Sequence, residues 1–278
     1  MAQAAPPLED PGKRERAATG LPVVPVFDGY RAWAIMGIVL LHLLFSAGVT
    51  ESAGGGWSGQ LISGTLYHVV EVLFIVSGFV VFMPTAARNG EFGSVGAFAI
   101  RRGARLYPAL WASLLIVLAL LAFYPGVTDP VPGIGEVLIN FAGMGTASTV
   151  FDPDLGYGLG VNGAIWTITP ELMFYAVLPL FASVYARHPL IGLGVAAAIA
   201  IGFRVLFDNV GDVASALGFE LSPQREVELY YAHFQQLPQY AFSFAAGMTG
   251  AWAYLRLRDS GQSWFASTGA TRKCVSRA

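Results

Sequence analysis

The chain has 278 residues, of which 55% are hydrophobic and only 12% are charged. Soluble domains usually carry about a quarter of their residues charged, so this composition argues against a soluble protein and favours lipid as the solvent. The net charge of -2 argues against nucleic-acid binding, and the single cysteine, Cys274, supports neither a disulfide framework nor a metal site.

The chain is expected to divide into an arm, a membrane domain and a tail. Residues 1–26 are rich in Pro and Ala and carry three basic residues, a composition that cannot bury much apolar surface. We therefore predict a disordered cytoplasmic arm there, a transmembrane domain over 27–258 and a polar tail over 259–278.

Six apolar stretches are long enough to cross a membrane, which takes roughly 20 residues for a core of ~30 Å. The predicted fold is therefore all-α, a polytopic transmembrane bundle of about six spans. The predicted spans are 30–48, 61–83, 107–124, 165–186, 189–207 and 237–255.

Two of the apolar stretches leave an alternative open. The first could be a cleaved signal peptide, although Arg31, Trp33 and His42 favour a retained helix. The run 134–148 is short and contains two glycines, so it is interpreted as a re-entrant or interfacial piece, with a seventh span as the alternative.

The basic residues predict the orientation of the bundle, because Lys and Arg stay on the cytoplasmic side in short loops. With both termini inside, only Arg204 and Arg225 of the 16 basic residues fall within a span or an outer loop. A multi-pass protein of the cell membrane with a cytoplasmic N-terminus is the consistent interpretation.

Arg31 and His42 lie eleven residues apart in the first predicted span, close to three helical turns. They therefore share one helix face, with ~16 Å between them along the axis. Arg31 is placed at the inner interface and His42 in the outer half of the membrane. An intramembrane His indicates function by default, whereas the structural alternative is a His satisfied by a neighbouring carbonyl.

Glu71 and Glu171 are carboxylates inside the second and fourth predicted spans. Counting along each helix puts them ~10 to 15 Å below the outer surface, close to the depth expected for His42. A carboxylate beside His42 would orient the imidazole while it takes a proton from a hydroxyl. The alternative is a neutral, hydrogen-bonded role in helix packing, and Ser77 with Gly78 also looks like a close-packing site.

Arg101, Arg102 and Arg105 end the predicted inner loop 84–106, at the start of the third span. Guanidiniums and the free N–H groups of a helix N-terminus could together clamp phosphate. A cytoplasmic anchor, or a contact with anionic lipid, explains clustered arginine equally well.

Four segments carry a recognisable order of motifs: 27–31 running on to His42, then 71–79, 102–108 and 166–175. They resemble the membrane-bound acyltransferase 3 family. The first is similar to its Asp-Gly-Leu-Arg opening and Arg-x10-His motif, and the second to its acidic, aromatic, Ser-Gly-Phe helix. The third and fourth are similar to Arg-x-x-Arg-(Ile/Leu)-Tyr-Pro and Trp-Ser-Leu-Ser-x-Glu-Glu-x-Phe-Tyr.

The resemblance implies a membrane-embedded O-acyltransferase. Its donor would be acyl-coenzyme A, most simply acetyl-coenzyme A, and its acceptor a hydroxyl of a sugar or an exported glycan. His42 would act as general base or, alternatively, as the nucleophile, with Glu171 or Glu71 orienting the imidazole or the acceptor. The donor phosphates would be held by the remaining candidates: Arg31, Arg102 and Arg105.

The chain departs from the family pattern in two places. Leu172 stands where the family often has a second Glu, so Glu171 alone would carry that acidic role. Family members usually continue through several further spans, so we expect a truncated bundle with a non-native end at 259–278. The alternative functions are a proton-coupled transporter or flippase, in which the same His and Glu relay protons, and an inactive membrane partner.

Overall fold

The computed structural model describes residues 26–48, 68–124, 126, 132–152, 159 and 161–259. Helices are the only regular secondary structure within these ranges, which confirms the all-α fold. The predicted arm and tail lie outside the described residues, except that Val26 already belongs to the first helix and Asp259 to the last described one. Residues 61–67 of the second predicted span are also outside them.

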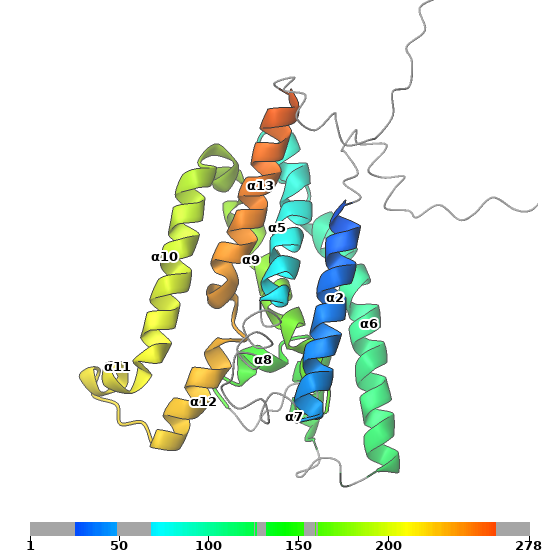
Figure 1. The fold of residues 1–278 in the computed structure, drawn as a ribbon, viewed down its shortest axis with the longest axis vertical. Helices are drawn as coiled ribbons and strands as arrows, with labels where there is room; N and C mark the ends of the chain where they lie inside the picture. Colours follow the sequence, from blue (N-terminus) through cyan, green and yellow to red (C-terminus); the bar gives the residue numbers. More distant parts are fainter. Residues whose placement is uncertain are drawn as a thin grey trace, which may run out of the picture.

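The described residues form long helices that run along the bundle and short ones near its lower end in Figure 1. The long helices are α2 (Val26–Ser46), α5 (Val69–Ala87), α6 (Val95–Phe123), α9 (Ile168–Arg187), α10 (Pro189–Asp208) and α13 (Ala241–Asp259). The short helices are α7 (Ile134–Phe141), α8 (Gly145–Ser148), α11 (Val210–Ala216), α12 (Pro223–His233) and the 3-10 helices η2 (Gly163–Thr167) and η3 (Leu237–Tyr240).

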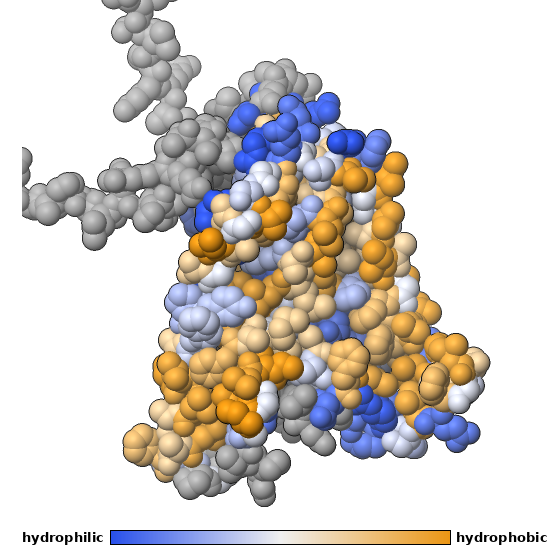
Figure 2. All heavy atoms as spheres, turned by 180° about the vertical axis from the view of Figure 1, so that it is seen from behind, coloured by the Kyte–Doolittle hydropathy of each residue, from blue (hydrophilic) through white to orange (hydrophobic). Residues whose placement is uncertain are grey.

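Five helical stretches in the described part are long and apolar enough to cross a membrane, which confirms the polytopic bundle. They are Val26–Leu44, Val69–Ala87, Val95–Phe123, Gly163–Arg187 and Pro189–Asp208. Figure 2 shows hydrophobic residues over most of the side of the molecule and the most hydrophilic ones toward its two ends. The sixth predicted span, 237–255, corresponds to η3 and α13, and α13 is not among the five because its last turn carries Arg256 and Arg258.

α13 packs closely against α5, with glycines on both sides of the contact. A Cβ added to Gly78 would lie 2.2 Å from the carbonyl oxygen of Phe244, and one added to Gly247 would lie 2.0 Å from that of Ile75. The two backbones therefore touch, as small residues allow in membrane bundles. This confirms the close-packing site predicted at Ser77 and Gly78.

Aromatic rings fill the core between α5, α9 and α13. Phe174 and Phe244 stack with their ring centroids 4.1 Å apart, and Phe74 lies 4.8 Å from Phe244. Each of these three residues is only two per cent exposed, so their rings form a buried aromatic core at this junction. The core sits directly beside the candidate site on α5 and α9.

α6 is much longer than the predicted third span. It begins at Val95, where the side chain of Ser94 accepts a hydrogen bond from the backbone N–H of Ala97 and caps the helix. The predicted loop 84–106 is therefore wrong at both ends, because 84–87 belong to α5 and 95–106 to α6. Arg101, Arg102 and Arg105 lie ~2 to 3 turns inside the helix, so the free N–H groups of its N-terminus cannot join them in a phosphate clamp.

The run 134–148 folds as two short helices, α7 and α8, separated by Gly143 in a left-handed conformation with φ of 75°. Neither helix approaches the length of a span, so the alternative of a seventh crossing is wrong. α7 packs on α6 around Leu110 and Leu114, and the indole N–H of Trp111 donates to the carbonyl oxygen of Phe141.

Candidate functional site

Glu171 is held in the bundle interior by two hydroxyl groups. Its Oε1 atom accepts a hydrogen bond of 2.9 Å from Ser77 on α5 and another from the hydroxyl of Tyr175, one turn further along α9. Tyr175 and Ser77 are both buried. A carboxylate inside an apolar bundle needs such donors, because an isolated charge there is costly.

Arginines from α2 and α6 lie near enough to this carboxylate for their charges to interact with it. The guanidinium carbon of Arg102 lies 5.7 Å from the ring centroid of Tyr175 and 5.6 Å from that of Phe98. The charge of Arg31 interacts with those of Arg105 and Glu171. We refer to these side chains together as the polar cluster: Arg31, Ser77, Arg102, Arg105, Glu171 and Tyr175.

The polar cluster has more positive than negative charge, because its three guanidiniums face the carboxylate of Glu171 and that of Asp28, which acts on Arg31. Arg102 is stacked between aromatic rings rather than paired, and its Nε–H is buried without a hydrogen-bond partner. A buried donor of this kind costs about 1 to 3 kcal/mol when it is left unsatisfied, and more when it is charged. The cluster is therefore suited to an anionic group.

His42 lies on α2, half-buried, and is bonded within its own helix. Its Nδ1 atom is 2.8 Å from the carbonyl oxygen of Ile38. Because a carbonyl oxygen only accepts, Nδ1 carries the proton, and Nε2 of the neutral ring keeps its lone pair. The ring can therefore accept a proton at Nε2, although its orientation comes from a carbonyl and not from a carboxylate.

The structure separates His42 from Glu171 along the bundle. α2 and α5 meet where Gly37 faces Val69, with 3.0 Å between Val69 Cγ1 and a Cβ added to Gly37. His42 lies ~7.5 Å beyond this contact in one direction, and Ser77, the partner of Glu171, ~12 Å beyond it in the other. The expectation that the imidazole and this carboxylate meet at one depth is therefore wrong, whereas Arg31 lies on the same side as Glu171.

Glu71 is also paired elsewhere. Its Oε1 atom lies 3.0 Å from Nδ1 of His68, one turn earlier, and 43% of the Glu71 side chain is exposed. The described contacts of Glu71 do not include His42. Glu71 follows Val69 by two residues along α5, in the direction away from His42. It therefore lies ~10 Å from His42 along the bundle axis.

Ser77 and Tyr175 are members of the site to which the sequence interpretation gave no chemical role. Ser77 was expected only to allow close packing, and Tyr175 appeared only as part of a motif. The spacing of Glu171 and Tyr175 was a usable signal, because residues four apart face each other on a helix. Ser77 could not be found this way, since its contact joins residues 94 positions apart.

A family model described as an acyltransferase domain, Acyl_transf_3, matches residues 24–271, nearly the whole chain. The chain belongs to this acyltransferase family. The match confirms the resemblance drawn from the four motifs. The matched range contains His42 and all residues of the polar cluster.

Two curated relatives are similar to this acyltransferase-family chain. Nodulation protein 10 of Rhizobium leguminosarum bv. viciae is 26% identical over 191 residues, covering 65% of this chain and 50% of that protein. The peptidoglycan O-acetyltransferase OatA of Listeria monocytogenes serovar 1/2a is 26% identical over 199 residues, covering 63% of this chain and 28% of that protein. The chain thus matches half or less of each relative's length, and no solved structure matches it.

Proposed function

We propose that this protein is a membrane-embedded O-acyltransferase that moves an acyl group, most simply acetyl, from acyl-coenzyme A to a hydroxyl of a sugar or an exported glycan. Membership of the acyltransferase family supports the reaction class. A relative named as a peptidoglycan O-acetyltransferase supports transfer to a hydroxyl-bearing glycan. The observation that carries the proposal is the polar cluster, whose unpaired buried Arg102 Nε–H favours an anionic donor.

The donor phosphates would be bound by Arg31, Arg102 and Arg105. Guanidinium groups present planar pairs of donors that match phosphate oxygens, and desolvation inside the bundle strengthens each charged contact. Glu171 would act through these arginines by balancing part of their charge, since Ser77 and Tyr175 hold its carboxylate on their side of the bundle.

His42 would act as the general base at the acceptor hydroxyl. Its Nε2 atom would take the hydroxyl proton while the hydroxyl oxygen forms a bond to the acyl carbon and the thioester C–S bond of the donor breaks. The coenzyme A thiolate released in this way would receive that proton, directly or through water, and leave His42 neutral again. The carbonyl of Ile38 would keep the proton on Nδ1 throughout. Glu71, which is 43% exposed and lies ~10 Å from His42 along the bundle axis, is the remaining candidate to orient the acceptor.

We place the N-terminus of the protein in the cytoplasm. In Figure 1 the start of α2, the α5–α6 turn and the end of α13 lie at the same end of the bundle. Arg88, Arg256 and Arg258 belong to these segments. Basic residues favour the cytoplasmic side, which is also where acyl-coenzyme A is available.

Replacing Arg102 and Arg105 together by Gln tests the donor site. Charge-assisted contacts are worth about 1.5 to 3 kcal/mol each, so affinity for coenzyme A should fall roughly a hundredfold or more. The measurement is calorimetric titration of coenzyme A into protein held in lipid nanodiscs. Arg204→Gln is the matched control, because Arg204 lies on α10, outside the polar cluster, and pairs with Asp208. Unchanged affinity for coenzyme A in a folded double variant would mean that these arginines only anchor α6 at the cytoplasmic side. The main support for the proposal would then be lost.

A further inference from the structure

A hollow of about 460 Å³ opens between the end of α10, α11 and the first turns of α12. It lies at the end of the bundle opposite the α5–α6 turn (Figure 1). The hollow is far from the polar cluster and shares no residue with it. Its lining combines aromatic rings and carboxylates: Phe207, Asp208, Asp212, Glu226, Tyr230 and Tyr231.

The tyrosines supply ring surface at the mouth of the hollow. Tyr231 is 65% exposed and Tyr230 is 37% exposed, and the two rings are nearly perpendicular with centroids 5.5 Å apart. Edge contacts with His233 and Phe234 fix the ring of Tyr230 from behind. The ring of Tyr230 is therefore held in place before any ligand arrives, and Tyr231 packs against its edge, which lowers the ordering cost of binding.

The carboxylates supply hydrogen-bond acceptors from two sides, because Glu226 lies on α12 with the tyrosines and the two aspartates come from α10 and α11. The carboxylate of Glu226 lies against the backbone of Gly211, where an added Cβ would come within 2.6 Å of Oε1. Asp208 pairs with Arg204 at 3.7 Å, which offsets one of the negative charges. Each carboxylate can accept several hydrogen bonds, so together they suit a ligand with many hydroxyl donors.

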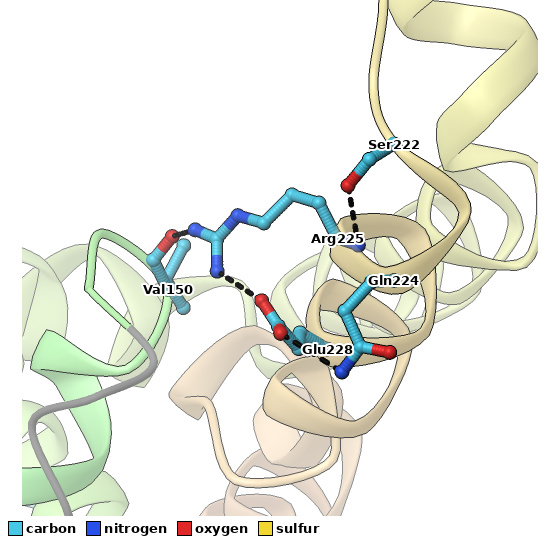
Figure 3. Close-up of polar contacts among 5 residues, drawn as sticks. All are labelled: Val150, Ser222, Gln224, Arg225 and Glu228. Carbon is cyan, nitrogen blue, oxygen red and sulfur yellow. Dashed lines mark hydrogen bonds and ion pairs between the residues drawn. The ribbon is translucent and has the colours of Figure 1, made fainter.

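α12 is tied to the rest of the bundle, so the hollow has a fixed wall. Figure 3 shows Arg225 reaching from α12 to the carbonyl oxygen of Val150, at 2.6 Å, while Glu228 holds the same guanidinium at 3.2 Å. The hydroxyl of Ser222 caps the helix by accepting from the N–H of Arg225. Arg225 is thereby directed away from the hollow, whose carboxylates keep their negative character.

The lining discriminates between ligand classes. Among the described residues, no group of three or more His, Cys, Asp or Glu side chains is arranged to hold a metal ion. A negatively charged ligand would be repelled by Asp212 and Glu226. Rings that cover the apolar face of a ligand, beside acceptors for its hydroxyl groups, favour an uncharged saccharide.

We infer that this hollow binds an uncharged saccharide segment, as a docking site for the acceptor glycan away from the transfer site. The inference rests on the proposed acyl transfer, because the bound saccharide is an acceptor only if that reaction takes place. Saccharide binding itself can be measured without any acyl donor. The volume fits, because small-molecule sites typically enclose roughly 300 to 1,000 Å³.

Saturation-transfer difference NMR on the protein in nanodiscs tests the inference. The probes are maltotetraose, cellotetraose and tetra-N-acetylchitotetraose, each presented without coenzyme A. At least one should show saturation transfer, and Tyr231→Ala should weaken its binding about tenfold, as expected for loss of one stacking ring. Tyr231→Phe keeps the ring and should retain binding, so a fold defect and a loss of stacking are distinguished.

Two control variants lie at the same end of the molecule. Tyr124→Ala removes an exposed tyrosine at the end of α6, and Glu220→Gln removes a carboxylate outside the lining. Both should bind like the parent protein, whereas Asp212→Asn should bind more weakly. The inference is overturned if no probe binds, if Tyr231→Ala binds normally, or if spermidine binds in place of the saccharides. Saccharide binding without acyl transfer would instead defeat the proposed reaction and leave the docking site standing.

Discussion

His42 and Glu171 illustrate how the same kind of problem, an ionisable group inside an apolar bundle, is solved by different partners. Glu171 takes two hydroxyl donors from α5 and α9, whereas His42 donates to a carbonyl one turn away on α2. The first solution ties helices together and the second leaves the outer ring nitrogen available. The second therefore leaves a lone pair for proton transfer to and from a mobile substrate.

His42→Gln is expected to abolish acyl transfer and leave donor affinity unchanged. Gln keeps a hydrogen-bonding group of similar size but cannot take up a proton at neutral pH. The donor phosphates would be held ~16 Å away along α2, beyond the reach of this change. Transfer of labelled acyl groups and calorimetric coenzyme A binding, measured on the same preparation, check the two halves of the prediction.

Parental acyl transfer in a well-expressed His42→Gln protein would defeat the base mechanism. If the parent protein shows proton-coupled flux and no transfer at all, the transporter alternative becomes the better explanation.

His233 is expected to make the stability of the bundle depend on pH. It is fully buried beside the ring of Phe207, and this burial lowers its pKa below the usual value of 6.5, although a hydrogen bond to the carbonyl of Tyr230 opposes the shift. Below about pH 6.5 the unfolded chain therefore binds more protons than the folded one, so stability should fall as the pH is lowered. Thermal unfolding in detergent, followed from pH 7.5 down to pH 5 and so across pH 6.5, measures how stability changes with pH.

His233→Gln should flatten this pH dependence even if it lowers the unfolding temperature at every pH, because Gln does not titrate. A slope equal to that of the parent protein would show that another group is responsible.

The ionisable residues of the site were predictable from sequence, but their pairing was not. Counting residues gives the depth of a side chain only if the helix ends where the apolar run ends. Glu171 was placed from the predicted start of its span, whereas its hydrogen bond to Ser77 puts it on the Arg31 side of the α2–α5 contact. Such a contact depends on how far each helix is shifted along its neighbour, which a single sequence does not encode locally.

At the scale of helices, the α5–α13 contact is the most sensitive to added volume. Gly78→Ala should destabilise the bundle by about 1 to 3 kcal/mol or more, because the new methyl group meets the backbone of Phe244, which cannot rotate away. Gly202→Ala on α10 is the control, since nothing lies within 4 Å of its added Cβ. Unfolding temperatures of the two variants in one detergent should therefore differ clearly.

Equal unfolding temperatures for Gly78→Ala and Gly202→Ala would mean that α5 and α13 separate easily. The close backbone approach would then contribute little to stability.

The positions of the helices followed well from hydropathy, and their ends followed poorly. Apolar runs located the cores of α2, α9 and α10 within a few residues, because lipid-facing surface must be apolar whatever the packing. α6 was predicted to begin twelve residues late, at 107 rather than Val95, since its arginines resemble a loop. Ser94 was the overlooked signal, because a serine before a helix satisfies a free N–H group.

For the whole molecule, the placement of the ends of α5 and α10 can be tested directly. Cys274→Ser leaves no cysteine in the chain, so a single one can be introduced as Ala87→Cys or Glu220→Cys. A membrane-impermeant maleimide should label only the Glu220→Cys protein in intact cells, and both proteins after permeabilisation. Labelling of both variants in intact cells would contradict the proposed orientation and the opposite placement of these segments in Figure 1.

The glycine contact between α5 and α13 also has a consequence for biosynthesis. Arg256 and Arg258 in its last turn leave α13 outside the set of helices that are apolar enough to enter a bilayer on hydropathy alone. Its backbone, however, lies directly on α5, a helix synthesised more than 150 residues earlier. We therefore expect α13 to depend on docking against α5 for its place beside the membrane spans, as packing and interhelical contacts can compensate for weak partitioning into lipid. A bulky residue at Gly78 would thus act on the nascent chain long after α5 itself had left the ribosome, by leaving α13 without a surface to join.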